Sequence, residues 1–185
     1  DSLFKGDNLY LKGNLRKGEV RIPGTALIVT AITGKTEIKN KVMDIDVSQG
    51  MLETSKIKQG MLEIDLFNYK HYPFDGDFLL EADLSMVPKT LITLMPDTQL
   101  ADELKRVHNI KGKVETRLGL AVPVDSSNIE VTGDAPQFSG SGNYERIPGI
   151  TSVEHTHFTY HDGIAGLKNI KGSICEIELD SVDAE

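Results

Sequence analysis

The chain has 185 residues and a formal net charge of −8 at neutral pH, with 20 basic and 28 acidic side chains. Because binding to a nucleic-acid backbone relies on clustered Lys and Arg, this acidic and scattered charge argues against a nucleic-acid partner. The apolar fraction of 39% and the absence of Trp suit a sheet with much solvated surface better than a thick globular core.

Short segments of alternating apolar and polar residues recur from one end of the sequence to the other. A β-strand points successive side chains to opposite faces, so each segment predicts a strand with one apolar and one polar side. The polar side carries many acidic residues. The apolar side defines the candidate lipid-facing positions Met43, Ile45, Val47, Leu62, Ile64, Leu66, Phe78, Leu80, Leu84, Leu118, Leu120, Val122, Phe158, Tyr160, Ile177 and Leu179.

Glycine-containing pairs recur between and beside these segments, and such pairs supply the positive φ that hairpin turns need. The copies of Gln-Gly-Met-Leu-Glu at 49–53 and 59–63 are ten residues apart, a spacing typical of one strand plus one turn in a meander. The pattern therefore predicts turns at 33–35, 49–50, 59–60, 75–76, 111–112, 132–134, 162–163 and 171–172.

Residues 85–108 break the alternation and predict a short helical hairpin. Ser85 can cap a first helix that carries Pro88 in its first turn. Such a hairpin could cover one end or one face of a long antiparallel sheet.

The second helix of this hairpin follows a proline. Pro96 forces a break in the chain, and Asp97 or Thr98 can start a new helix. Its apolar face is predicted to consist of Leu100, Leu104 and Val107.

Three histidines are the first candidates for metal chemistry. His155, His157 and His161 would share one face of a strand, where two His at alternate positions can chelate Zn or Cu. Spacing places no carboxylate or Cys to complete such a site. We therefore expect the histidines on the polar side, Phe158 and Tyr160 on the buried side, and neither a metal nor a cofactor.

Two further motifs are weak candidates for catalysis. Gly140-Ser141-Gly142 lacks the Lys-Ser/Thr of a phosphate-binding loop and the outer glycine spacing of a nucleophile elbow, so it predicts a strand with close backbone packing or a bulge. Cys175 is the single cysteine and alternates with apolar residues, which predicts a buried packing thiol. The acidic residues form alternating rows rather than a converging pair, so we expect no enzyme activity.

Periodicity alone leaves two architectures open. The apolar face could be the core of a closed barrel or sandwich, or it could line a single curled sheet that the helical insert covers only in part. We expect one segment over 1–185, with possible sub-repeats at 1–84 and 110–185 around the insert 85–108. No apolar run approaches the roughly 18 residues of a membrane span, and the start at Asp1 rather than Met suggests processing or an artificial boundary.

Three sets of residues resemble the AsmA-like family of bacterial envelope proteins. The first set is the strand-rich opening, the second surrounds the helical insert, and the third is similar to the repeated hairpin of the family. These sets are residues 31–50 with 57–66, residues 78–88 with 110–120, and residues 158–163 with 167–174. After Gly172 the family often has a further Gly-x-Ser, where this chain has Ser173-Ile174-Cys175.

The resemblance implies a long twisted antiparallel sheet curled into a groove or half-barrel with an apolar interior. It implies phospholipid or another acyl-chain lipid as the partner, carried between inner and outer membrane. It also implies a location in the periplasm, with further repeats and an inner-membrane anchor in the parent protein.

The sequence leaves other functions open. One alternative is a structural or protein-interaction module for outer-membrane assembly that binds no lipid. A glycan-binding β-sandwich is a second alternative, although aromatic residues, on which sugars usually stack, make up only 6% of the chain.

Overall fold

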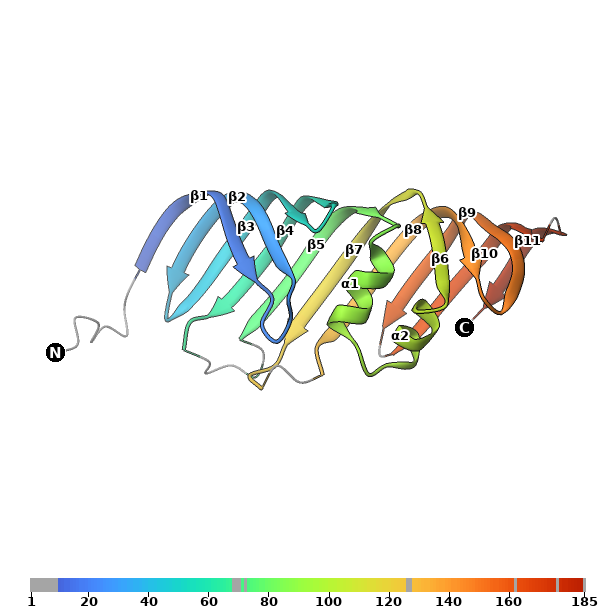
Figure 1. Ribbon diagram of the computed structural model, residues 1–185. Helices are drawn as coiled ribbons and strands as arrows, with labels where there is room; N and C mark the ends of the chain where they lie inside the picture. The colour runs from blue at the N-terminus through green and yellow to red at the C-terminus, as the bar shows by residue number, and fades with distance from the viewer. Residues whose placement is uncertain are drawn as a thin grey trace.

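The computed structural model describes residues 10–67, 71, 73–125, 128–161, 163–175 and 177–184, and over these residues it forms one sheet of eleven strands with two short helices (Figure 1). The sheet is antiparallel, curled and not closed into a barrel, which confirms the predicted fold class. The elements are β1 (Tyr10–Arg21), β2 (Ile28–Lys39), β3 (Val42–Leu52), β4 (Ser55–Asp65), β5 (Phe74–Asp83), α1 (Val87–Leu94), α2 (Gln99–Leu104), β6 (Val107–Lys111), β7 (Lys113–Val122), β8 (Glu130–Tyr144), β9 (Ile147–His161), β10 (Ile164–Ile174) and β11 (Ile177–Ala184).

The sheet is a meander in which neighbours in sequence are neighbours in space. Its strand order is β1-β2-β3-β4-β5-β7-β8-β9-β10-β11, and β6 pairs with the second half of β8. The insert formed by α1, α2 and β6 leaves the sheet after β5 and rejoins it at β7. The predicted helical hairpin therefore interrupts the meander without changing its order.

Most of the predicted turns are wrong. Six of them lie inside strands, namely those at 33–35, 49–50, 59–60, 75–76, 132–134 and 171–172. Gly112 and Gly163 do lie in connections, with φ of 130° and 81°, while Asp162 is outside the described residues. The β2–β3 hairpin instead turns on Asn40 and Lys41, both with positive φ, as a type I′ turn requires.

Glycines inside the strands mark places where two backbones come close together. A Cβ on Gly34 of β2 would lie 2.1 Å from the carbonyl oxygen of Asp46, and one on Gly60 of β4 would lie 2.5 Å from that of Asp77. These glycines therefore serve strand packing rather than chain reversal.

Bulged residues bend the long strands. Lys17, Ala31, His155, Asn169 and Ser181 have φ between 50° and 59°, and each lies at or beside a register shift of its strand. A β-bulge bends its strand and increases the local twist. The bulges thus let the strands arch over, and in Figure 1 the end of hairpin β1–β2 comes down in front of β3 to β5.

The helices differ from the prediction in two details. Ser85 does not cap α1: its hydroxyl binds Asp83, and the N-cap is Met86, which makes no side-chain cap bond. Val107 is not helical but begins β6. The predicted Pro88 lies in the first turn of α1, and Thr98 caps α2 by accepting a bond from the amide of Ala101 at 3.1 Å.

The folded-over segments form a second layer on the sheet. Ile22 and Leu27, from the β1–β2 connection, share one hydrophobic core with Leu94 and Met95 at the end of α1 and with Phe78 of β5. Figure 1 shows α1, α2 and β6 in front of β7 to β9. The main core therefore lies between the concave side of the sheet and this second layer.

Among the helices that the structure describes, neither is long and apolar enough to cross a membrane.

Candidate functional site: the apolar concave face

Strand register places the alternating apolar residues in rows on one side of the sheet, here called the apolar concave face. Ile45 of β3 lies opposite Leu62 of β4, and Phe78 of β5 lies opposite Leu118 of β7. Leu120 of β7 in turn lies opposite Val131 of β8. All of these side chains are buried, so the rows form one continuous surface across the middle of the sheet.

The structure brings most of the candidate lipid-facing residues together on this face. Three more, Met43, Ile64 and Phe158, are half-buried and pack against the core, and Leu179 on β11 is half-buried. Two lie away from the core: Leu66, after β4, is 44% exposed, and Ile177 on β11 is 66% exposed. The fully buried candidates are Ile45, Val47, Leu62, Phe78, Leu80, Leu84, Leu118, Leu120, Val122 and Tyr160.

Helix α1 covers a small apolar cavity on this face. The cavity has a volume of about 80 Å³ and lies between Val87 and Leu91 of α1 and the side chains of the sheet below. From the sheet it is lined by residues of β3 to β5 and β7 to β9, among them Leu52, Leu80, Ala82, Leu118, Val131, Phe158 and Tyr160. Burial in this apolar setting raises the pKa of the Tyr160 hydroxyl.

A larger and more polar hollow adjoins this cavity. It has a volume of about 510 Å³ and lies between the β1–β2 connection, the α1–α2 connection and the facing ends of β8 and β9. Val131, Thr132 and Tyr160 line both spaces. Asp97 and Glu130 also line the hollow, so a site with an apolar interior and an acidic mouth is formed at this end of α1.

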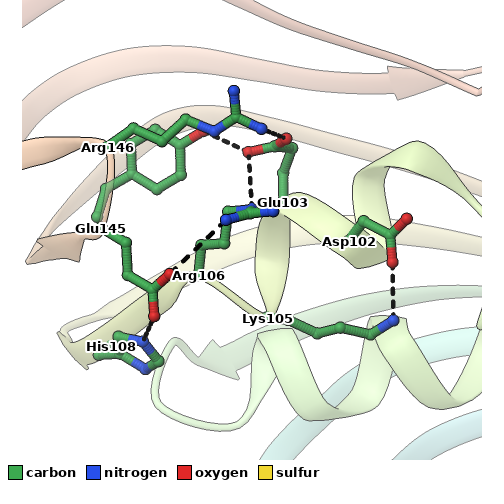
Figure 2. Close-up of polar contacts among 8 residues, drawn as sticks. Asp102, Glu103, Lys105, Arg106, His108, Glu145 and Arg146 are labelled. Carbon is green, nitrogen blue, oxygen red and sulfur yellow. Dashed lines mark hydrogen bonds and ion pairs between the residues drawn. The ribbon is translucent and has the colours of Figure 1, made fainter.

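Helix α2 is held to the sheet by a polar cluster around Glu103 (Figure 2). The Tyr144 hydroxyl, at the end of β8, donates to one carboxylate oxygen of Glu103, and Arg146 donates to the other at 2.5 Å. The bond to Glu103, together with burial, raises the pKa of Tyr144. These bonds connect α2 directly to the β8–β9 hairpin.

The same cluster also includes Glu145, which precedes Arg146 in the β8–β9 turn. Glu145 accepts from His108 of β6 at 2.8 Å and lies 3.8 Å from Arg106. The hydrogen bond from His108 lowers the pKa of Glu145. The cluster therefore ties α2 and β6 of the second layer to the β8–β9 turn of the sheet.

Replacing Glu103 by Gln is expected to loosen α2 without unfolding the sheet. Gln keeps the shape of the side chain but removes the charge that faces Arg146, so we expect a loss of about 1 kcal/mol in the free energy of unfolding. Amide exchange in α2 should become faster, while exchange in β5 should change little.

The matched control is Asp102→Asn on the same helix. Asp102 pairs with Lys105 at 2.8 Å, a contact within the helix that does not reach the sheet. Exchange in α2 that rose equally in both variants would show that the contacts of Glu103 to the hairpin do not hold the helix.

Two of the three histidines, His155 and His157, lie on the opposite, convex side of β9, and the exposed His161 at the end of the strand lines the hollow beside α1. His157 lies 2.6 Å from Asp134 of β8, and His155 lies 3.0 Å from Gln137. Tyr160 is buried and Phe158 packs against the core, which confirms the predicted arrangement of this strand. Within the described ranges, no group of three or more His, Cys, Asp or Glu side chains could hold a metal ion.

The acidic rows of the convex side are paired across strands. Arg117 donates to Asp77 at 2.8 Å, and Lys113 donates to Glu81 at 3.2 Å. Lys58 reaches over β5 to Glu115, which raises the pKa of Lys58. These carboxylates are spread over an exposed surface, as the alternating pattern predicts.

The remaining two candidates for catalysis were Gly140-Ser141-Gly142 and Cys175, and the first lies in a strand and the second in a turn. Gly140 lies inside β8, where a Cβ would be 2.7 Å from the Leu84 side chain and 3.2 Å from the carbonyl oxygen of Lys111. A register shift lies beside it, so the predicted close-packed or bulged strand is confirmed. The expectation of a buried thiol is wrong: Cys175 lies half-exposed in the β10–β11 turn with a φ of 49°. The turn separates Cys175 from the strand pattern that the alternation suggested.

Sequence reasoning missed several residues that complete the site. Leu91 covers the cavity from α1, and Val131 lines it from β8. Ile22 and Leu27 fold onto the concave face from a connection. Val131 alternates with Ile129 and could have been found, whereas no local pattern shows that a connection will fold back over the sheet.

Comparison of the chain with protein-family models, with curated proteins and with solved structures gives no match.

Proposed function

We propose that this chain is a non-enzymatic segment of a bacterial envelope protein that binds phospholipid through its apolar concave face. The resemblance of its strand and insert motifs to the AsmA-like family supports this proposal. The parent protein would lie in the periplasm, anchored in the inner membrane, with further repeats beside this segment. Its role would be to pass lipid between the inner and outer membranes and so to maintain the outer membrane.

The observation that carries the proposal is the pair of adjacent spaces at α1. An apolar cavity under α1 and a more polar hollow beside it share Val131, Thr132 and Tyr160 in their walls. A phospholipid has the same division, with apolar tails and a polar headgroup. The acidic Asp97 and Glu130 at the hollow favour a headgroup that carries an amine, such as phosphatidylethanolamine.

Helix α1 is the cover that must move for an acyl chain to enter. The cavity of about 80 Å³ is far smaller than the roughly 300–1,000 Å³ of typical ligand pockets. The N-cap of α1 makes no side-chain cap bond, and the exposed Lys89 of α1 lies 3.9 Å from Glu53, a weak type of contact. Displacing α1 would open the concave face without breaking the sheet.

A structural module without lipid binding is the second candidate. It is favoured by the burial of ten of the sixteen candidate residues beneath the second layer. In that case the apolar concave face is simply the core, and protein contacts at the surface carry the function.

Filling the cavity separates these two candidates. Ala82 lines the cavity from β5, and Ala82→Leu places an isobutyl group in the space that an acyl chain would use. We expect the variant to stay folded, with a stability loss of about 1–3 kcal/mol, and to bind fluorescent phosphatidylethanolamine at least about tenfold more weakly than the wild type. Native mass spectrometry of the wild type purified from bacteria should show stoichiometric phospholipid.

The control is Ala121→Leu in β7. Ala121 lies between the buried Leu120 and Val122 and so points to the convex side. Equal lipid binding by wild type, Ala82→Leu and Ala121→Leu would contradict the proposed site. A lipid-free mass spectrum of the wild type, with no uptake of an apolar dye, would favour the structural module.

A further inference from the structure

The two outer strands of the sheet have free edges within the described part of the chain. β1 pairs only with β2, and β11 pairs only with β10, among the strands described over 10–67, 71, 73–125, 128–161, 163–175 and 177–184. A free edge presents unpaired backbone N–H and C=O groups that can pair with another strand. Each edge is therefore a surface on which a further strand can be added.

The two edges carry opposite charge. Strand β1 has four basic residues and one acidic residue, Glu19, whereas β11 has three acidic residues and no basic one. Like-charged edges repel each other, so β1 would not pair with β1, or β11 with β11. The charged residues are Lys12, Arg16, Lys17 and Arg21 on β1, and Glu178, Asp180 and Asp183 on β11.

The apolar concave face also continues to both edges. On β1, Leu11 lies opposite Ile38 of β2 and is 52% exposed. On β11, Val182 lies opposite the buried Ile170 and is 43% exposed, and Ile177 lies opposite Ile174. Two such edges placed side by side would cover apolar side chains that each edge leaves exposed.

Strand direction allows this pairing without any rearrangement. Nine antiparallel steps lead from β1 to β11 along the ten-strand path, so β11 runs opposite to β1. A second copy shifted along the sheet would place its β1 antiparallel to β11 of the first copy. The concave faces of the two copies would then lie on the same side.

We propose that β11 of one copy of this chain pairs with β1 of a second copy, which extends the sheet and joins the two apolar concave faces. The contact is head-to-tail, so it leaves a free β1 edge and a free β11 edge for further copies. At each edge a second copy takes the place that a further repeat of the parent protein would take. The inference therefore concerns the 185-residue chain by itself, rests on its two edges, and does not depend on lipid binding.

Charge reversal at each edge tests the pairing. In the variant Arg16→Glu/Lys17→Glu both edges are acidic, and in Glu178→Lys/Asp180→Lys both are basic. In sedimentation-velocity experiments we expect the wild type to associate with rising concentration, and roughly tenfold more weakly at ~500 mM than at ~50 mM salt. Each variant alone should remain a monomer, and an equimolar mixture of the two should associate again.

Renewed association of the two variants when they are mixed would show that both are folded and that the edges pair through their opposite charges. Hydrogen exchange supplies an independent readout, since backbone amides of β1 and β11 should be protected in the associated wild type while amides of β5 stay unchanged. A wild type that remains monomeric at low salt, or a mixture that stays monomeric, would overturn the proposal. Association that is equal in all four samples would also overturn it.

Discussion

Replacing Phe78 by Ala is expected to lower the free energy of unfolding by about 3–5 kcal/mol, the usual cost of removing a fully buried Phe. Phe78 lies in the middle strand β5 and is 1% exposed. Its ring fills the space that a Cβ on Gly60 or Gly76 would occupy, at 2.6 Å in each case. Because the backbones around the ring are held by strand pairing, they cannot collapse into the cavity. Urea unfolding followed by circular dichroism measures the loss.

Phe67→Ala is the matched control for this substitution. Phe67 follows β4, is 54% exposed, and has Lys41 above its ring at 5.4 Å. We expect its loss to cost less than about 1 kcal/mol. Comparable costs for the two substitutions would show that the concave side of β5 is not the centre of the core.

Replacing Gly34 by Ala is expected to destabilise the protein by at least about 2 kcal/mol. The added methyl group would lie 2.1 Å from the carbonyl oxygen of Asp46 and 3.2 Å from Cα of Val47. These are backbone atoms of the paired strand β3, so the clash can be relieved only by separating the two strands. Thermal unfolding measures the change in stability, and amide exchange in β2 and β3 shows where the structure opens.

Gly13→Ala in β1 is the corresponding control. A Cβ on Gly13 would meet only a methyl group of Thr36, at 3.7 Å, which is an ordinary contact. Its effect should stay within about 0.5 kcal/mol. If Gly34→Ala were equally mild, β2 and β3 would not approach each other as closely as the structure shows.

Helix boundaries were predictable where the signals are local. Pro96 stops α1, and Thr98 caps α2 through its own side chain. Ser85 failed as a cap because the side chain of Asp83 competes for it, binding both its hydroxyl and its amide. The outcome depended on an acidic residue two positions earlier, which the capping pattern does not include.

Glycine was a poor guide to the turns of this sheet. A glycine is suited both to a positive φ and to close approach of two backbones, and sequence alone does not distinguish these uses. At Gly34 and Gly60 the second use applies, since both lie within strands and a Cβ on either would clash with a backbone carbonyl oxygen of the neighbouring strand. Strands of 10 to 15 residues therefore run through positions at which turns were predicted.

The candidate site was predictable only in part. Alternation identified the apolar row of each strand, because the two faces of a strand are set by the chain itself, and Ile45 and Leu120 are buried as expected. Alternation could not show which row lies beneath α1. Leu91 and Leu80 are eleven residues apart, yet they meet across the cavity only because the insert folds back over β5.

The sequence by itself determined the antiparallel strands, their apolar and polar sides, the two short helices and the opposite charges of β1 and β11, since these depend on residues close together in the chain. Only the tertiary structure decided how far the sheet curls and what covers it. Bulges such as those at Ala31 and His155 form where paired strands must accommodate an extra residue, and that depends on register between strands. Whether Ile177 is exposed while Ile45 is buried likewise depends on which segment folds over each end of the sheet.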